Sequence, residues 1–261
     1  PVAPAAALAP VGETFTVKTD LVEATIAAQG GDLVGLELLH YRAHEAKDQN
    51  FRLFDGKHQY VAQSGLIGDG LPNHRSPFKR VAGPTELAPG SDQLQVRLEA
   101  AAANGIKVAK IFTFRRGSYV VDVAWEVDNG SDKALAPHAY FQLQRDDQAP
   151  EGETKMVSTF TGPAVFTDAD KYQKISFEDV AKDKAKFTKT AKDGWLAMVQ
   201  HYFVAAWVPQ GDTPREFYMR KVEGGGNVFQ AGVIVPVAQV APGAKASTVV
   251  SLFAGPQEHA I

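Results

Sequence analysis

Alternation of apolar and polar residues with a period of two runs through most of the chain and constrains its fold more than any other feature. It is clearest from Tyr119 to Val127, where Asp, Ala and Glu separate the apolar positions. Successive side chains of a β-strand point to opposite faces, so this pattern predicts a strand with one buried face. Residues 93–99 and 22–26 repeat the pattern, and the second run ends at Gly30-Gly31, which is typical of a turn.

Further strands are predicted wherever a short apolar or alternating run lies between Gly, Pro or Asn-Gly turns. They cover residues 34–38, 59–64, 106–115, 138–144, 155–160, 172–177, 195–202, 204–208, 216–222, 228–235 and 247–253. Helical periodicity is scarce and predicts only one or two turns at residues 39–47 and 177–186. Roughly fifteen short strands at near-regular spacing predict an all-β chain, folded as a large antiparallel sandwich with one or two short helices.

The strand series has no break in composition, so residues 14–256 are predicted to form one domain. Residues 1–13 precede it as an Ala- and Pro-rich stretch, which is typical of a semi-extended tether. Residues 257–261 follow a proline and are predicted to begin a helix, because proline favours the first helical position. Within the domain, residues 66–89 carry several Gly and Pro residues and no clear period, which predicts a long surface loop.

Composition and charge exclude several classes of function. The formal net charge is −3 and consecutive basic residues occur only in pairs, which argues against a nucleic-acid-binding protein. The chain has no cysteine, so disulfides, thiolate metal sites and cysteine nucleophiles are excluded. No apolar run approaches the roughly 20 residues with which a helix crosses a bilayer.

Catalytic and metal-binding patterns are nearly absent from the sequence. His40 and His44 have the spacing of a helical metal pair, but the HExxH pattern is missing, and a solvated short helix is the favoured interpretation. Asp146 and Asp147 are adjacent on an extended chain and therefore point to opposite faces. This favours a charge cluster in a loop over a catalytic pair.

A group of aromatic residues offers two interpretations. Trp195, Tyr202, Phe203 and Trp207 could form a sugar-binding face, because aromatic rings stack on flat apolar ligands. Filling of the core explains the same residues and is the favoured interpretation. No catalytic residue, cofactor-binding residue or metal ligand is predicted.

A series of ordered segments distinguishes the chain from an arbitrary β-sandwich. The most specific is GWLAMVQHYF at residues 194–203, which runs into Ala206-Trp207-Val208-Pro209. The others are Val17-Lys18-Thr19-Asp20, Gly30-Gly31-Asp32, Ala62-Gln63-Ser64-Gly65-Leu66, Arg116-Gly117-Ser118-Tyr119, Val240-Ala241-Pro242-Gly243 and Phe253-Ala254-Gly255-Pro256. Together they resemble the large periplasmic domain of the YidC-type membrane protein insertases of Gram-negative bacteria. The resemblance extends over about residues 16–256.

The resemblance implies a β-supersandwich, the fold of galactose mutarotases, on the periplasmic face of the bacterial inner membrane. It implies that a membrane helix precedes the tether at residues 1–13, and that residues 257–261 begin a helix leading to further membrane spans. It also implies a non-enzymatic role in inserting and folding inner-membrane proteins, with the Sec translocon or independently. The implied partners are SecD and SecF of the translocon, nascent membrane proteins and periplasmic chaperones; no cofactor is implied.

The leading hypothesis is an interaction and scaffolding domain, because sheet edges and a groove can take up extended peptides. Residues 165–177 mix aromatic and charged residues between two strand signals, as the rims of interfaces often do. The residues predicted to form a partner surface are Asp168, Asp170, Lys171, Tyr172 and Lys174. An ordinary hairpin is the simpler interpretation of the same segment.

The rival hypothesis is a carbohydrate-binding or aldose-epimerase-like domain, which the same fold permits. Epimerisation at an anomeric carbon needs a general acid and a general base on opposite sides of the sugar ring, usually a carboxylate and a histidine. His138 and His201 lie on predicted strands, with Asp146 or Glu216 as conceivable partners. Nothing in their spacing requires them to converge.

Overall fold

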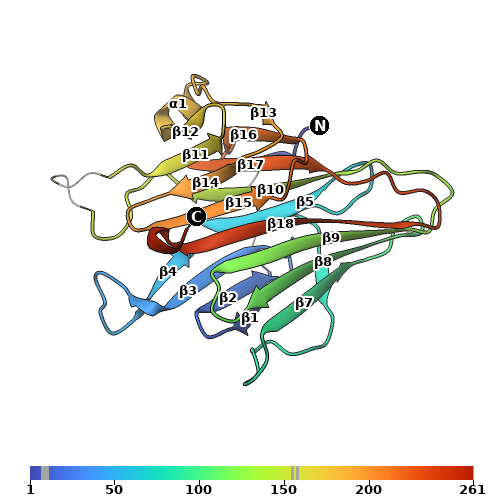
Figure 1. The fold of residues 1–261 in the computed structure, drawn as a ribbon, viewed down its shortest axis with the longest axis horizontal. Helices are drawn as coiled ribbons and strands as arrows, with labels where there is room; N and C mark the ends of the chain where they lie inside the picture. Colours follow the sequence, from blue (N-terminus) through green and yellow to red (C-terminus); the bar gives the residue numbers. More distant parts are fainter. Residues whose placement is uncertain (7–11, 154–155, 157–158, 261) are drawn as a thin grey trace.

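The computed structural model describes residues 1–6, 12–153, 156 and 159–260, and these form two antiparallel sheets that enclose a common core (Figure 1). In this part of the chain there are eighteen strands, one short α-helix and one 3-10 turn. The prediction of a large antiparallel sandwich with one or two short helices is confirmed. No helix among the described residues is long and apolar enough to cross a bilayer.

Sheet 1 consists of β1 (Thr14–Lys18), β2 (Val22–Ala27), β3 (Leu33–Arg42), β4 (Asn50–Phe54), β5 (Val61–Ile67), β10 (His138–Asp146), β13 (Thr190–Ala191), β16 (Arg215–Lys221) and β17 (Val228–Pro236). Their order is β1-β2-β3-β5-β10-β17-β16-β13, and β4 pairs with β3.

Sheet 2 consists of β6 (Phe78–Arg80), β7 (Gln93–Ala100), β8 (Ile106–Arg115), β9 (Val120–Asn129), β11 (Gly162–Thr167), β12 (Lys171–Lys174), β14 (Trp195–Val199), β15 (Phe203–Pro209) and β18 (Lys245–Pro256). Their order is β12-β11-β14-β15-β18-β9-β8-β7-β6, so the last strand in sequence lies at the centre of the sheet. The 3-10 turn Gln257–His259 follows it.

The alternating runs bury one face each, as the sequence predicts. In β9, Val121, Val123 and Trp125 are buried, whereas Asp122 and Glu126 are partly exposed on the outer face. The turn predicted at Gly30-Gly31 is confirmed, because both glycines have positive φ angles of 74° and 63°.

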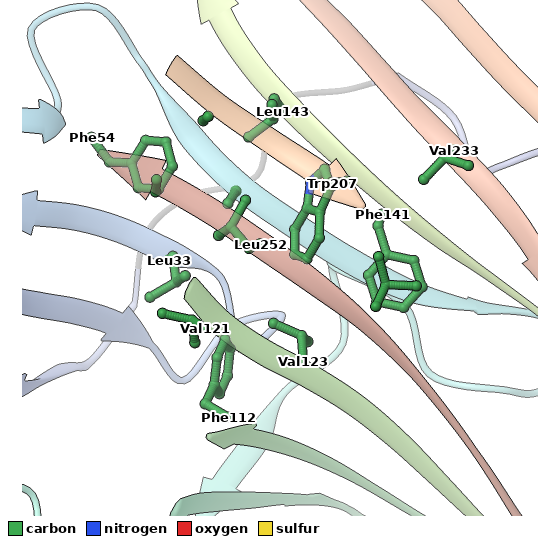
Figure 2. Packing of buried hydrophobic residues seen from close by; sticks show 14 of the residues in the cluster. Leu33, Phe54, Phe112, Val121, Val123, Phe141, Leu143, Trp207, Val233 and Leu252 are labelled. Carbon is green, nitrogen blue, oxygen red and sulfur yellow. The ribbon is translucent and has the colours of Figure 1, made fainter. Parts of the chain in front are cut away.

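The inner faces of the two sheets meet in one large core. Figure 2 shows Trp207 of β15 beside Phe141 of β10, with a distance of 5.1 Å between the ring centroids. Trp125, Trp207 and Phe141 are each at most 1% exposed. Burying an aromatic side chain stabilises a fold by about 1.5–3 kcal/mol, so these contacts between strands of different sheets hold the sandwich together.

The helix predicted at residues 39–47 is wrong. β3 continues to Arg42 and pairs with both β2 and β4, and a turn then leads into β4. His40 therefore lies in an exposed strand end and His44 in the turn after it, so they share no helical face. Backbone hydrogen bonds to two neighbouring strands outweigh a helix of two turns, which is marginal by itself.

The helix predicted at residues 177–186 is confirmed only in its first part, as α1 (Phe177–Ala181). Its N-cap is Ser176, whose hydroxyl accepts a hydrogen bond from the amide of Asp179. This cap also explains why the strand predicted at residues 172–177 ends at Lys174. The strand predicted at residues 155–160 falls largely outside the described residues, and residues 156, 159 and 160 are not in a strand.

The predicted surface loop at residues 66–89 is more ordered than expected. β5 extends into it to Ile67, and β6 lies inside it and pairs with β7. The main chain of Lys18 bonds to the main chains of Thr85 and Leu87, and Leu87 is buried. Residues 85–87 thereby pair with the last residue of β1 and satisfy its backbone groups at the open edge of sheet 1.

A β-bulge shifts the register of β2 and β3 between Thr25 and Ile26. As a result Leu33, Leu36 and Leu38 face the core, whereas Val34 is only half-buried. Val34 therefore does not share the buried face of Leu36 and Leu38, although the three alternate in the predicted strand 34–38, because one extra residue exchanges the two faces of a strand.

Candidate functional site

The outer face of sheet 2 has an apolar half formed by β11, β14, β15 and β18. In β15, Ala205 and Trp207 face the core, whereas Val204 and Ala206 face outward and pack with Val199 of β14. Strands that are apolar on both faces are typical of sheets covered on both sides. Here the outward side chains line an open groove of about 500 Å³, called the outer groove below.

The outer groove has an aliphatic floor and an aromatic wall. The residues that line it are Val120, Tyr172, Trp195, Val199, Val204, Ala206, Val208, Ser251, Phe253, Gln257 and Ala260. The ring of Trp195 stacks on Phe166 at a centroid distance of 5.4 Å and tilts against Tyr172 at 5.8 Å. Tyr172 remains 40% exposed, so an aromatic edge is open to a partner.

Gly194 allows Trp195 to lie against Phe166. Its φ angle is +90°, and a Cβ atom at this position would overlap the main-chain oxygen of Phe166. Only glycine adopts this conformation without strain and leaves room for the approach. The aromatic wall therefore depends on the first residue of the sequence run that resembles the insertases.

The hairpin of β11 and β12 carries the predicted partner surface at the edge of sheet 2. Asp168 and Asp170 lie in its turn, where the amide of Asp168 donates to Asp193 and Asp170 accepts from Thr188. Tyr172 lines the outer groove, and the ammonium of Lys174 lies 5.5 Å from the centre of its ring. Lys171, at a positive φ of 56°, is exposed beside the turn.

The structure thus brings Tyr172 and Lys174 to the rim of the outer groove. The two aspartates are held by bonds within the hairpin turn and its neighbours. The ordinary hairpin of the simpler interpretation is present as well, because β11 and β12 pair over four residues each. The short, Lys-containing β12 is typical of a protected sheet edge, which favours contact through the groove over addition of a strand.

The other half of the outer face, over β7, β8 and β9, is a charged depression of about 570 Å³. Its charges pair among themselves: Arg97 lies 2.7 Å from Glu126 and 3.0 Å from Glu99. Exposed pairs of this kind contribute little to stability, and the three positive and three negative side chains that line the depression balance each other. The charged half is therefore a weaker candidate than the outer groove.

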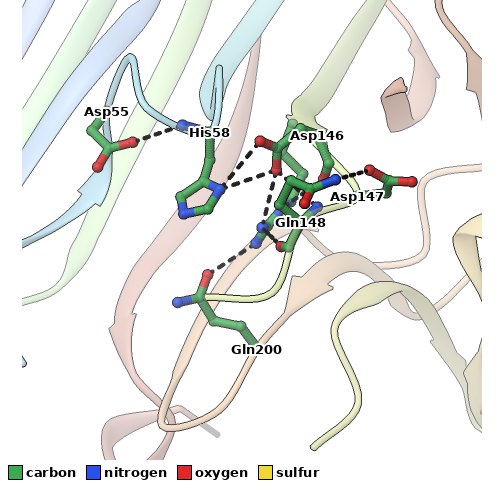
Figure 3. Close-up of polar contacts among 7 residues, drawn as sticks. Asp55, His58, Asp146, Asp147, Gln148 and Gln200 are labelled. Atoms are coloured by element: carbon green, nitrogen blue, oxygen red, sulfur yellow. Dashed lines mark hydrogen bonds and ion pairs between the residues drawn. The ribbon is translucent and has the colours of Figure 1, made fainter. Parts of the chain in front are cut away.

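A polar cluster closes the end of β10, as Figure 3 shows. The ring of His58 lies 3.1 Å from the carboxylate of Asp146, and Arg145 donates to the main-chain oxygens of Asp146 at 2.9 Å and of Gln148 at 2.7 Å. The carboxylate of Asp147 instead accepts a hydrogen bond from Gln148. The two neighbouring aspartates thus have different partners and form no paired-carboxylate site.

The residues of the epimerase hypothesis are mostly separated. Asp146 is occupied by His58, and His201 contacts the hydroxyl of Thr159 at 2.9 Å. Only His138 and Glu216 line a common depression, at the end of sheet 1, and burial lowers the pKa of His138. The described residues contain no group of three or more His, Asp or Glu side chains that could hold a metal ion.

The four aromatic residues that offered two interpretations have different environments. Trp207 is buried in the core, and Phe203 stacks on Phe51 at a centroid distance of 4.1 Å. Tyr202 is 69% exposed, and Trp195 lines the outer groove. They do not form one face, so the core explanation holds for Trp207 and the idea of a shared sugar-binding face is wrong.

Sequence reasoning missed the floor of the outer groove. Val199, Val204, Ala206 and Phe253 were interpreted only as strand residues. A signal was present, because the runs at residues 195–199 and 203–209 are apolar at successive positions and therefore have two apolar faces. Such a run cannot show whether the second face is covered by the same chain.

The sequence matches a known family and several named proteins. The family described as YidC periplasmic domain matches residues 14–261. A protein from Dechloromonas aromatica named membrane protein insertase YidC is 71% identical over 254 residues, which are 97% of this chain and 46% of that protein. A protein of the same name from Aromatoleum aromaticum is 53% identical over 256 residues, with the same coverage. The chain spans about half the length of these relatives.

Solved structures show the same fold at low sequence identity. A galactose mutarotase related enzyme from Lactobacillus acidophilus has a TM-score of 0.55 at 11% identity. The aligned part is 93% of this chain and 97% of that enzyme. A putative aldose 1-epimerase from Escherichia coli K12 has a TM-score of 0.54 at 10% identity, with coverages of 94% and 99%. These likenesses confirm the mutarotase-like fold, and the sequence matches confirm the family. The chain belongs to the family of YidC periplasmic domains.

Proposed function

We propose that the chain is a non-catalytic interaction domain of a membrane protein insertase, and that its outer groove receives an apolar segment of an inserting membrane protein. The outer groove itself carries this proposal. Contiguous apolar surface with an aromatic wall is unusual on a free surface and typical of an interaction site. In this proposal the domain stands on the periplasmic face of the inner membrane, as the names of its relatives suggest.

A second contact of the same domain is proposed for the hairpin. Asp168, Asp170 and Lys171 form an exposed charged tip beside the groove. Charged rims direct partners and set the rate of encounter more than they add affinity. The partner proposed for this tip is SecD or SecF of the Sec translocon. Binding of either protein would hold an inserting segment next to the groove. Periplasmic chaperones are a further proposed class of partner.

The groove proposal predicts contact-specific crosslinking. The photoreactive residue p-benzoylphenylalanine replaces Tyr172 in the full-length insertase, in inner-membrane vesicles that contain a stalled nascent membrane protein. Adducts with the nascent chain are expected at Tyr172 and not at Val249, which lies on the same face of sheet 2 and is 36% exposed but outside the groove. Adding Ala206→Glu should lower the yield of the adduct formed at position 172 about tenfold, because the substitution places a charge in the apolar floor of the groove.

The control for this substitution is Val249→Glu, which adds the same charge outside the groove and should leave the adduct unchanged. Equal adduct yields at Tyr172 and Val249, or a yield at Tyr172 that is insensitive to Ala206→Glu, would exclude the outer groove as the contact site. Circular dichroism of each variant separates loss of the groove from loss of the fold.

The hairpin proposal predicts a loss of affinity on charge reversal. The triple substitution Asp168→Lys, Asp170→Lys and Lys171→Glu should reduce the amount of SecF recovered with the full-length insertase in a pull-down. Rim charges mainly affect association, so a loss of about tenfold at low salt and less at high salt is expected. Recovery of SecF at the level of the unsubstituted protein would remove the hairpin tip as a contact. That result would leave the groove proposal intact.

A further inference from the structure

The first residues of the chain lie against the outer face of sheet 1. Ala3 is only 5% exposed and packs on Tyr140 of β10 and Ile234 of β17, whereas Ala5 is exposed. Pro1 lines the neighbouring depression together with His138. Val2, next to the buried Ala3, is 79% exposed, and such a contrast between adjacent residues is the pattern of an extended segment seated on a surface.

Arg220 of β16 holds this segment by its main chain. Its guanidinium donates to the carbonyl oxygen of Pro4 at 2.8 Å and to that of Ala3 at 3.3 Å. It also donates to Gln230 at 2.9 Å. Among the described residues no carboxylate lies within 4.0 Å of it, so its partners are neutral oxygens, and the N-terminal segment supplies two of them. Recognition of carbonyl oxygens is independent of the side chains of the segment.

The floor under Ala3 is aromatic and fixed in place. The hydroxyl of Tyr218 donates to Gln142 at 2.7 Å, and the hydroxyl of Tyr140 accepts from the amide of His74 at 2.9 Å. A Cβ atom on Gly232, in the middle of β17, would lie 2.5 Å from the ring of Tyr218. Glycine within a strand often marks such a close approach. The ring of Tyr218 therefore lies flat over the sheet and forms a surface for a ligand.

We propose that the outer face of sheet 1 is a binding site for an extended, proline-containing peptide, and that residues 1–4 of this chain are its ligand in cis. The segment Pro1-Val2-Ala3-Pro4 has prolines three residues apart, the spacing of one polyproline II turn. The residue before a proline is restricted to extended conformations, which lowers the entropy lost on docking. Aromatic floors that receive such segments are a recurring mode of peptide recognition.

The site has three elements, which lie on the neighbouring strands β10, β17 and β16. Tyr140 and Ile234 accept a small side chain at the position of Ala3, and Tyr218 extends the aromatic floor. Arg220 fixes the direction of the segment through two consecutive carbonyl oxygens. Because the cis ligand is covalently attached, its effective concentration is high and it blocks the site for other peptides until it is displaced.

Thiol reactivity tests whether the segment is docked. The 261 residues of the chain contain no cysteine, so Ala3→Cys and Ala5→Cys are each introduced into a full-length protein from which any other cysteine has been removed. Alkylation by a maleimide is expected to be at least about tenfold slower at position 3 than at position 5. Arg220→Met should bring the two rates together, whereas Lys221→Met, at the next and exposed position, should leave the difference unchanged.

Binding of a peptide in trans tests whether the face is a site. A fluorescein-labelled peptide, Pro-Val-Ala-Pro-Ala-Ala, is titrated into the full-length protein and followed by fluorescence anisotropy. Ala3→Glu expels the cis segment from its buried position and should expose the site. The peptide is then expected to bind at least about tenfold more tightly than to the matched variant Ala5→Glu. Adding Arg220→Met to Ala3→Glu should abolish this gain.

Each alternative result decides against the proposal. Equal alkylation rates at positions 3 and 5 would show that the segment is not docked. A rate difference that survives Arg220→Met would show that Arg220 does not hold it. Equal peptide affinity of Ala3→Glu and Ala5→Glu would show that the face holds its own segment without being a binding site for another. None of these results bears on the outer groove, which lies on the other sheet.

Discussion

Lys110→Met is expected to lower the free energy of unfolding by about 3–5 kcal/mol at pH 8, and by clearly less at pH 5. Lys110 is 1% exposed and donates to the main-chain oxygens of Gly31 at 2.8 Å and Gly30 at 3.3 Å. It is the cation that offsets the buried carboxyl of Asp32, which also accepts a hydrogen bond from Gln63 at 3.0 Å. Without Lys110, the carboxylate remains buried and uncompensated.

The pH dependence follows from the direction of the pKa shift. Burial raises the pKa of Asp32 to about 7, although Lys110 opposes this, and the pKa of an unfolded aspartate is about 3.9. A group whose pKa is higher in the folded than in the unfolded state stabilises the fold. This stabilisation is full at pH values below the unfolded-state pKa and is lost as the pH rises through the folded-state pKa. Removing Lys110 raises the pKa of Asp32 further, so the additional loss appears as the pH rises through about 7, where the unsubstituted protein ionises this carboxyl.

Urea unfolding at pH 5 and pH 8 measures the effect. Lys107→Met is the matched control, because Lys107 lies on the same strand and is exposed; it should change the free energy of unfolding little at either pH. Adding Asp32→Asn to Lys110→Met should restore much of the stability at pH 8, since it removes the charge that was left without a partner. Equal losses for Lys110→Met at both values of pH would refute this account of the pair.

Arg145→Met is expected to lower the free energy of unfolding by about 3–5 kcal/mol, although methionine fills a similar volume. Arg145 is 1% exposed, and its guanidinium supplies donors to the oxygens of Asp146, Gln148 and Gln200. Leaving these acceptors without donors costs their full desolvation penalty. The same change frees the end of β10, which pairs with both β5 and β17 in the middle of sheet 1.

Chemical denaturation of Arg145→Met and of Arg97→Met measures this difference. Arg97 makes two ion pairs, but its side chain is 42% exposed, so its loss is expected to cost at most about 1 kcal/mol. A cost for Arg145→Met as small as that for Arg97→Met would contradict a structural role of the cluster. It would then reopen His58 and Asp146 as candidates for a chemical function.

The sequence was informative wherever one face of a strand is buried and the other is solvated. β7, β8 and β9 follow the predicted residues closely for this reason, because the alternation of Leu94, Val96 and Leu98 has only one strand register that buries it. Local signals were less reliable where sheet pairing competes with them. The segment after Leu39 shows this, since its apparent helical spacing was overruled by the pairing of β3 with its two neighbours.

The candidate sites were harder to predict than the fold. Tyr172 and Lys174 could be nominated from the sequence because they lie in a segment with a mixed composition. The floor of the outer groove lies on strands that look equally suited to the interior, and burial depends on what another part of the molecule covers. Arg220 offered no signal at all, because its partners are main-chain oxygens more than 200 residues away in the sequence. Contacts between residues so far apart in the sequence depend on the order in which the strands are arranged in the sheets.

The central place of β18 has a consequence for the synthesis of the chain. β18 forms nine residue pairs with β9 and seven with β15, and among the strands that the structure describes it alone joins the two halves of sheet 2. An N-terminal portion that lacks residues 245–256 leaves two facing strand edges without partners, and such edges invite wrong pairings. The domain therefore cannot complete its fold before residues 245–256 have been synthesised, and until then the edges of β9 and β15 lack their partner.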